Sequence, residues 1–205
     1  RGWSHVLAFV ASAALGGVMI GLAPGAQART ATIIYVLGLC TMLGVSSLYH
    51  RVRWGESGMA FMRRLDHSTI FLAIAGTYTP IAVLSLSGWQ QPAVLVTVWA
   101  GTFLGIALQW LPLDVPRWLS TAVYAAVGWV AFIALPQLFT DLGPVGFGLV
   151  LGGGIAYTLG AVVYATKWPD PWPAVFGFHE VFHACTVVGA GMHLAAVGLI
   201  VLPSA

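Results

Sequence analysis

The chain has 205 residues, of which 59% are hydrophobic and only 7% are charged, and its mean hydropathy is +0.91. These values exclude a soluble globular domain and indicate an integral membrane protein. The net charge of +2 comes from basic residues that flank apolar segments, so we expect no nucleic-acid partner.

Apolar stretches near the length of about 20 residues that crosses a bilayer recur along the chain. Short polar or Pro/Gly-marked breaks separate them. We expect the first of these stretches to be a span rather than a cleaved signal. The sequence therefore predicts one domain, 1–205, that is an all-α bundle of seven transmembrane helices. The predicted spans are 3–23, 31–50, 66–86, 93–111, 118–138, 145–165 and 178–202.

Lys and Arg collect in cytoplasmic loops, so their positions test this count of spans. With seven spans and a cytoplasmic N-terminus, every basic residue except Arg29 falls inside and the C-terminus is external.

The break at 51–64 carries half of the basic charge together with Trp54 and Phe61. We predict that it lies along the headgroups as an amphipathic topology anchor. The expected location is a bacterial cytoplasmic membrane.

The stretch FHEVFHACTVVGAGMH, residues 178–193, puts three histidines and one glutamate into the seventh predicted span. Ionisable residues inside a membrane are costly and mark functional sites. His179 and His183 are one helical turn apart, so both imidazoles can bind one ligand. His193 lies roughly 15 Å further along the axis, too far to share that ligand, and Cys185 is expected on the other side of the helix.

The predicted topology brings candidate partners from two other spans to the same depth. The second span ends on the cytoplasmic side with GVSSLYH, which places His50 at the edge and Ser46 one turn deeper on the same face. The third span starts on that side with Asp66 in its first turn. Three neutral imidazoles with one open position are typical of catalytic zinc, and a nearby carboxylate can hold or deprotonate the bound water. We therefore predict that His50 joins His179 and His183 as zinc ligands, with Asp66 beside the metal.

Simpler roles remain open for several of these residues. His50 follows Tyr49 and fits an interfacial anchor, and Asp66 fits the N-cap of the third span. His179 also fits an exposed first-turn residue of the seventh span. Glu180 is expected to be one, because its charge complements the helix N-terminus.

The remaining polar and small residues have structural explanations. His5 and His67 are expected to be interfacial or packed rather than ligating. For His193 and the polar run GTYTP at 76–80, hydrogen bonding between helices and lining a cavity both stay open. The glycine-rich run LGGGIAYTLG at 151–160 predicts close helix packing.

Three motifs resemble those of the bacterial hemolysin III proteins: SSLYHR at 46–51, LDHSTIFLAIAGTYTP at 65–80 and HEVFHACTVVGAGMH at 179–193. That family is similar to the progestin and adipoQ receptors, which include the adiponectin receptors, and more remotely to the alkaline ceramidases. The resemblance covers nearly the whole chain in span order. It implies a seven-helix bundle with zinc near the cytoplasmic side, ligated by His50, His179 and His183. It also implies that Asp66 holds the zinc-bound water and that Ser46 is the nearby serine.

These residues support functions from two classes. The first is a zinc-dependent intramembrane hydrolase of an amide or ester in a membrane lipid, in which Asp66 orients the attacking water and Ser46 helps to stabilise the oxyanion. The second is a non-enzymatic receptor-like or membrane-homeostasis protein with structural zinc. A channel or cytolysin is a third hypothesis with less support. A channel needs polar residues at several depths along one path, which only GTYTP and His193 offer, and a secreted cytolysin would show an amphipathic barrel pattern, which is absent. The lipid, the native metal and the oligomeric state stay open.

Overall fold

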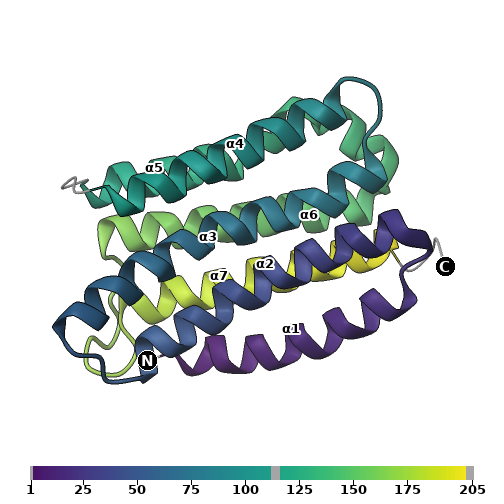
Figure 1. Cartoon of the computed structure of the whole chain (residues 1–205). Helices are drawn as coiled ribbons and strands as arrows, with labels where there is room; N and C mark the ends of the chain where they lie inside the picture. The colour runs from purple at the N-terminus through teal and green to yellow at the C-terminus, as the bar shows by residue number, and fades with distance from the viewer. Residues whose placement is uncertain (1, 112–115, 202–205) are drawn as a thin grey trace.

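The computed structural model describes residues 2–111 and 116–201, and this part of the chain is almost entirely helical. No β-strand occurs in these two ranges, which confirms the predicted all-α class. Successive long helices run in alternating directions along one axis (Figure 1). The helices are α1 (Trp3–Leu22), α2 (Gly25–Arg51), α3 (Glu56–Ser85), α4 (Gln90–Trp110), α5 (Arg117–Gly128), the 3-10 helix η1 (Val130–Ala134), α6 (Leu135–Thr166) and α7 (Phe178–Val201).

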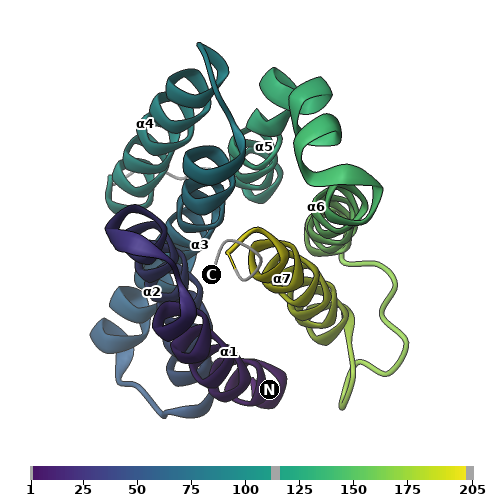
Figure 2. The same cartoon turned by 90° about the vertical axis from the view of Figure 1, so that its right-hand side faces the viewer.

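Among the described residues, six helical stretches are long and apolar enough to cross a membrane. Five of them are α1, α2, α3, α4 and α7, and the sixth is Trp118–Thr166. A straight helix of those 49 residues would be about 73 Å long, more than twice the hydrocarbon core. The stretch instead folds back on itself around η1 and Gly143, whose φ is 63° and ψ 178°, so that α5 and α6 lie side by side (Figures 1 and 2). Its two arms fit the predicted fifth and sixth spans, while the count of seven and the sidedness of the termini stay predictions.

Two helices begin before the spans that the sequence predicts. α2 begins at Gly25 and α3 at Glu56, six and ten residues before the predicted spans. Most of the predicted headgroup segment 51–64 is therefore the first part of α3, because a helix can continue past the residues that lipid requires to be apolar. The predicted fifth span is interrupted after Gly128 by η1. The predicted external C-terminus, 202–205, lies outside the described residues, as do Arg1 and the side chain of Arg117.

Glycines set the distance between α2 and α3. A Cβ on Gly38 would lie 2.6 Å from the Leu72 carbonyl oxygen, and one on Gly76 would lie 3.1 Å from the Ile34 carbonyl oxygen. A larger residue at either position would push the two backbones apart, as at other close-packed membrane helices. This contact fixes α3 against the helix that ends with His50.

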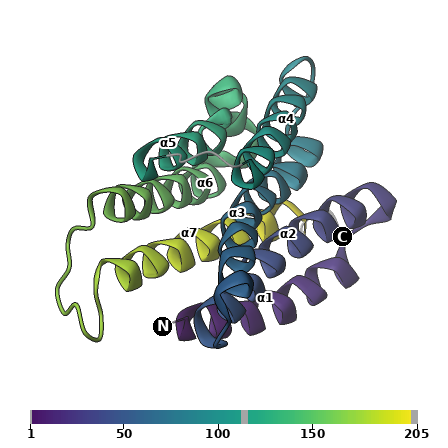
Figure 3. The ribbon, with the colours of Figure 1, turned by 60° about the vertical axis from the view of Figure 1, so that its left-hand side comes forward.

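The α6–α7 pair packs in a similar way. A Cβ on Gly153 would lie 2.4 Å from the His193 ring, and one on Gly160 would lie 3.0 Å from the Cys185 Cβ. The predicted packing role of the 151–160 run is thereby confirmed, and Cys185 faces α6. α7 thus lies between α6 on one side and α1 on the other (Figure 3).

Tyr78 shows what the polar run 76–80 does. Its hydroxyl donates to the Gly128 carbonyl at 2.7 Å and accepts from the Ala131 N–H at 2.8 Å. These two backbone groups lie where α5 gives way to η1, and buried backbone groups need partners inside a membrane protein. Of the two alternatives left by the sequence, Tyr78 takes hydrogen bonding between helices.

Candidate metal centre

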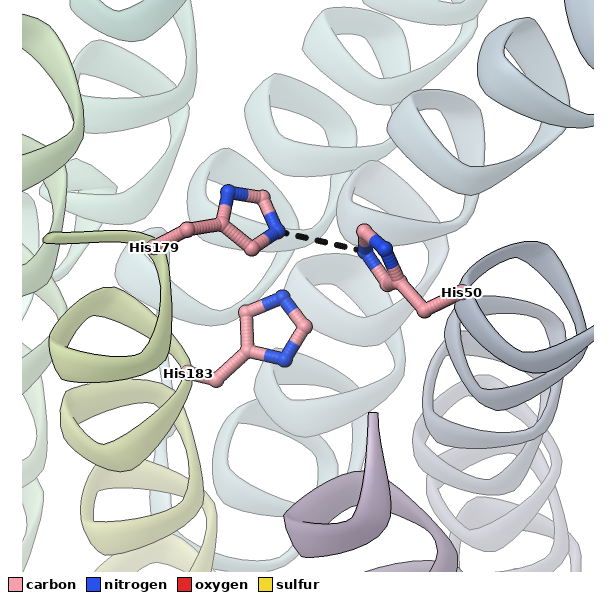
Figure 4. Close-up of side chains that lie close together, drawn as sticks. All are labelled: His50, His179 and His183. Carbon is pink, nitrogen blue, oxygen red and sulfur yellow. Dashed lines mark hydrogen bonds between the residues drawn. The ribbon is translucent and has the colours of Figure 1, made fainter. Parts of the chain in front are cut away.

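Three histidines meet at the end of the bundle where α1, α3 and α7 begin and α2 ends, which we call the histidine end. His50 comes from the last turn of α2, and His179 and His183 come from the first two turns of α7. The three side chains point toward one another (Figure 4). One ring nitrogen from each can be chosen so that all three lie within 4.8 Å of one another. Residues separated by more than 120 positions therefore share one site.

The spacing of the His50 and His179 nitrogens fits a tetrahedral ion, and the nitrogen of His183 lies within 4.8 Å of both. Nε2 of His179 lies 3.2 Å from Nε2 of His50, and the three ring centroids are 4.5 to 4.9 Å apart. Nitrogens that each lie about 2.0–2.1 Å from a tetrahedral zinc ion would be about 3.4 Å from one another. His183 is buried, whereas His50 and His179 are half-buried, so the cluster has one enclosed side and one accessible side. These nitrogens can hold a divalent metal and leave a position for another ligand.

Ser46 is linked to this cluster through His5, which binds its hydroxyl and stacks on His183, and Asp66 is linked to it through Ser46. Asp66 is half-buried, and its carboxyl interacts with the hydroxyl of Ser46, which is buried on α2. Among the described residues, Asp66 is not one of those whose ligand atoms gather within 4.8 Å. Because α3 begins at Glu56, Asp66 lies in its third turn and the alternative of an N-cap is wrong.

The start of α7, which carries the histidine pair, is held by two carboxylates. Glu180 accepts a hydrogen bond from the Gly177 N–H at 3.0 Å, and Asp170 accepts one from the Phe178 N–H at 2.7 Å. Helix N-termini leave such donors unsatisfied, so Glu180 complements the helix start as expected. The expectation that it is exposed is wrong, because its side chain is half-buried. In zinc proteases the glutamate of an H-E-x-x-H helix is the general base, but here Glu180 binds backbone instead.

His5 is the site residue that the sequence interpretation missed. It is 2% exposed, and its ring stacks on that of His183 with centroids 3.9 Å apart and planes within 6°. Its Nδ1 lies 2.9 Å from the Ser46 Oγ in a buried hydrogen bond. The expectation that His5 is packed is correct, but the packing partner is a candidate metal ligand. The available signal was its place in the first turn of α1, at the same predicted depth as the other histidines.

The start of α1 also covers His50. A Cβ on Gly2 would lie 3.0 Å from the His50 Cβ, and Arg51 lies 3.6 Å over the ring of Trp3. A cation over an indole ring is attracted by its quadrupole, which helps to hold the two helix ends together. α1 therefore closes one side of the cluster.

The two remaining histidines do not join the three-histidine group in the described part of the chain. Nε2 of His193 donates to the Val150 carbonyl at 3.0 Å, and its ring centroid is 5.5 Å from that of Tyr157. The sequence alternatives for His193 thus resolve to hydrogen bonding between α6 and α7. The backbone carbonyl of His67 accepts a hydrogen bond from the Tyr124 hydroxyl at 3.2 Å.

Comparisons with known proteins agree with the motifs. A family model described as Haemolysin-III related matches residues 1–194. The chain is 31% identical to Hemolysin-3 of Bacillus cereus over 182 residues, which cover 88% of this chain and 79% of that protein. It is 34% identical to the Hemolysin-3 homolog of Bacillus subtilis (strain 168) over 126 residues, or 62% of this chain and 56% of the other. It is also 24% identical to the Adiponectin receptor protein of Drosophila melanogaster over 216 residues, or 93% of this chain and 48% of the receptor.

Proposed function

Because the chain belongs to the Haemolysin-III related family and is a multi-pass integral protein of the bacterial cell membrane, we propose that it is a zinc-dependent hydrolase of an amide or ester bond in a membrane lipid. The observation that carries this proposal is the gathering of three imidazoles within 4.8 Å, with a carboxyl and a hydroxyl beside them. When bound there, zinc would polarise the substrate carbonyl and bring the pKa of a coordinated water near neutrality.

The roles of the chain's own residues follow from their positions. His50, His179 and His183 are the proposed zinc ligands. The Asp66 carboxylate would orient the attacking water and accept its proton, since it lies beside the cluster without joining it. The Ser46 hydroxyl would donate to the oxyanion that forms as the carbonyl is attacked.

A membrane lipid is the substrate class that suits this location. The cluster lies at one end of a bundle whose outer surface exposes large apolar side chains, such as Leu7 and Leu48 near the histidine end. Apolar side chains exposed on membrane helices contact acyl chains rather than water. An acyl lipid could therefore bring its carbonyl to the depth of His50 from the adjoining leaflet.

The direct test is lipid hydrolysis by the purified chain in nanodiscs. Acylated sphingolipids and glycerolipids would be supplied one at a time, and released fatty acid would be measured with zinc, after chelation and after zinc is restored. The expected result is release that disappears with chelation and returns with zinc. The matched control is Asp141→Asn, an exposed residue on α6, which should hydrolyse lipid as the wild type does. Absence of zinc-dependent release from every lipid class would overturn the proposal.

A second candidate is a non-enzymatic protein in which the metal joins helices. It is favoured by the packing: α2 packs mainly on α3, and α7 packs mainly on α6, whereas α2 and α7 contact each other little. A metal held by His50 and His179 would tie the two pairs together. Asp66→Asn separates the candidates, because a purely structural site would keep both zinc and biological activity.

A further inference from the structure

His5 carries more contacts within the site than packing requires. Its ring covers one face of His183, and its Nδ1 binds the hydroxyl of Ser46. Ser46 in turn interacts with the Asp66 carboxyl. One side chain of α1 thus contacts both a candidate metal ligand of α7 and the proposed oxyanion donor of α2.

The other ring nitrogen of His5 is available for a ligand. Nε2 is buried and has no hydrogen-bond partner in the described structure. Buried polar atoms are almost always paired, so an unpaired one beside a reactive cluster needs an explanation. Since the His5 ring lies flat on that of His183, with centroids 3.9 Å apart, Nε2 is also next to the cluster. A group that arrives only with substrate would satisfy it.

The ordinary alternative is a histidine that only fills space between helices. A buried polar atom without a partner destabilises a fold. Phenylalanine or leucine would fill the same space without that cost. His193 provides the comparison: its Nδ1 is likewise buried without a partner, but its Nε2 donates to the backbone at Val150 and ties α6 to α7. The Nδ1 of His5 instead binds Ser46, inside the site, and its ring also interacts with the backbone of His183, a candidate metal ligand.

We propose that His5 is a substrate-binding and positioning residue, which orients Ser46 through Nδ1 and binds the polar group next to the scissile amide or ester through Nε2. This inference rests on the proposed hydrolase function and deepens it. His5 is not a metal ligand, because among the described residues it stands outside the three-histidine group.

Three substitutions separate the two nitrogens. The amide of His5→Asn can reach the place of Nδ1 and keep the contact with Ser46, but it leaves the place of Nε2 empty. The longer side chain of His5→Gln does the reverse. His5→Phe keeps an aromatic ring against His183 and removes both nitrogens. His193→Gln is the matched control, because its amide can still donate to Val150.

The measurement uses the full chain loaded with Co²⁺ in nanodiscs and titrated with octanohydroxamate, followed by the visible absorption of cobalt. This probe carries an acyl chain and an amide-like head that binds metals. We expect every variant to keep one cobalt and the wild-type spectrum before titration. Affinity for octanohydroxamate should fall about tenfold in His5→Asn and at least as much in His5→Phe, and should stay within about threefold of wild type in His5→Gln and His193→Gln.

Each contrary result is informative. Unchanged affinity in His5→Phe would show that the ring only packs and would overturn this inference while leaving the hydrolase proposal intact. Loss of cobalt from His5→Asn and His5→Gln would make His5 a ligand, and would also overturn it. A wild type that binds octanohydroxamate in a His5-dependent way but hydrolyses no lipid would overturn the proposed function. Of this inference it would overturn only the role at a scissile bond and would leave His5 as a ligand-binding residue. A wild type that binds no cobalt would overturn both.

Discussion

The two ends of the histidine run on α7 show how neighbours decide what a residue does. His179 and His183 meet a third imidazole from α2, and each presents a nitrogen toward it. His193, ten residues after His183 on the same helix, faces the backbone of α6 at Gly153 and donates to the Val150 carbonyl. The first pair can hold an ion, whereas Nε2 of His193 is occupied by a structural hydrogen bond. Residue type alone therefore does not identify a site in this bundle.

The largest expected effect is on zinc affinity. It should follow from removing His183, a candidate ligand, and not from removing His193. His183→Ala is expected to lower zinc affinity by more than the roughly 100-fold that loss of an outer-shell partner can cause. His193→Ala should keep its zinc. Metal analysis of the two purified variants beside the wild type measures this. Equal zinc content in both would break the contrast between the two ends.

Removing the carboxyl beside the cluster should affect turnover but not binding. Asp66→Asn is expected to keep one zinc and to lose about 100- to 10,000-fold in the rate of lipid hydrolysis, as for loss of a general base. Zinc content and fatty-acid release, measured on one preparation, check both parts. If the variant loses its zinc, Asp66 is a ligand and not a neighbour of the metal.

Near His193, the stability of the protein should depend on the size of the side chain at position 153. Gly153→Val puts a branched side chain where a Cβ alone would lie 2.4 Å from the His193 ring, so we expect the free energy of unfolding to fall by about 1–3 kcal/mol. Gly148→Ala is the control on the same helix, since a Cβ there meets nothing within 4 Å. Thermal unfolding in detergent gives the comparison. A Gly153→Val protein as stable as Gly148→Ala would contradict the close packing of α6 and α7.

The smallest effect should come from keeping the hydrogen bond of His193 while removing its ring. His193→Gln retains an N–H near the Val150 carbonyl, and we expect a loss of about 1 kcal/mol or less. For His193→Ala we expect roughly 1–3 kcal/mol, because this change removes the hydrogen bond and leaves a cavity beside Tyr157. The same unfolding measurement distinguishes them. Equal losses in the two variants would show that the ring, and not the hydrogen bond, matters at this position.

The features of the fold that follow from the apolar length of each helix were predictable from the sequence. Apolar length marked the six helical stretches that could cross a membrane, and alternating direction put the end of α2 and the start of α7 at one depth, so His50 could be matched with His179 and His183. The start of α3 at Glu56 was missed, because hydropathy reports contact with lipid and not helix formation. Interruption of the fifth span by η1 was missed as well, since Tyr78, which binds the freed backbone groups, lies on another helix.

The contacts of His5 were not predictable for a different reason. Depth in the membrane can be inferred from position within a span, but lateral order around the bundle cannot. The stack of His5 on His183 requires α1 to lie against α7, although the two helices are at opposite ends of the sequence. The sequence placed His5 at the headgroups or packed between helices. Only the three-dimensional arrangement shows that its neighbour is His183.

The backbone contact at Gly38 limits how the length of this chain can vary. Twelve helical residues, or about 18 Å, separate Gly38 from His50, and one inserted residue would rotate the imidazole by about 100° around α2. Insertions in the short connection after α2 would leave that angle unchanged. Homologous chains should therefore differ in loop length but keep the number of residues between the glycine and the histidine.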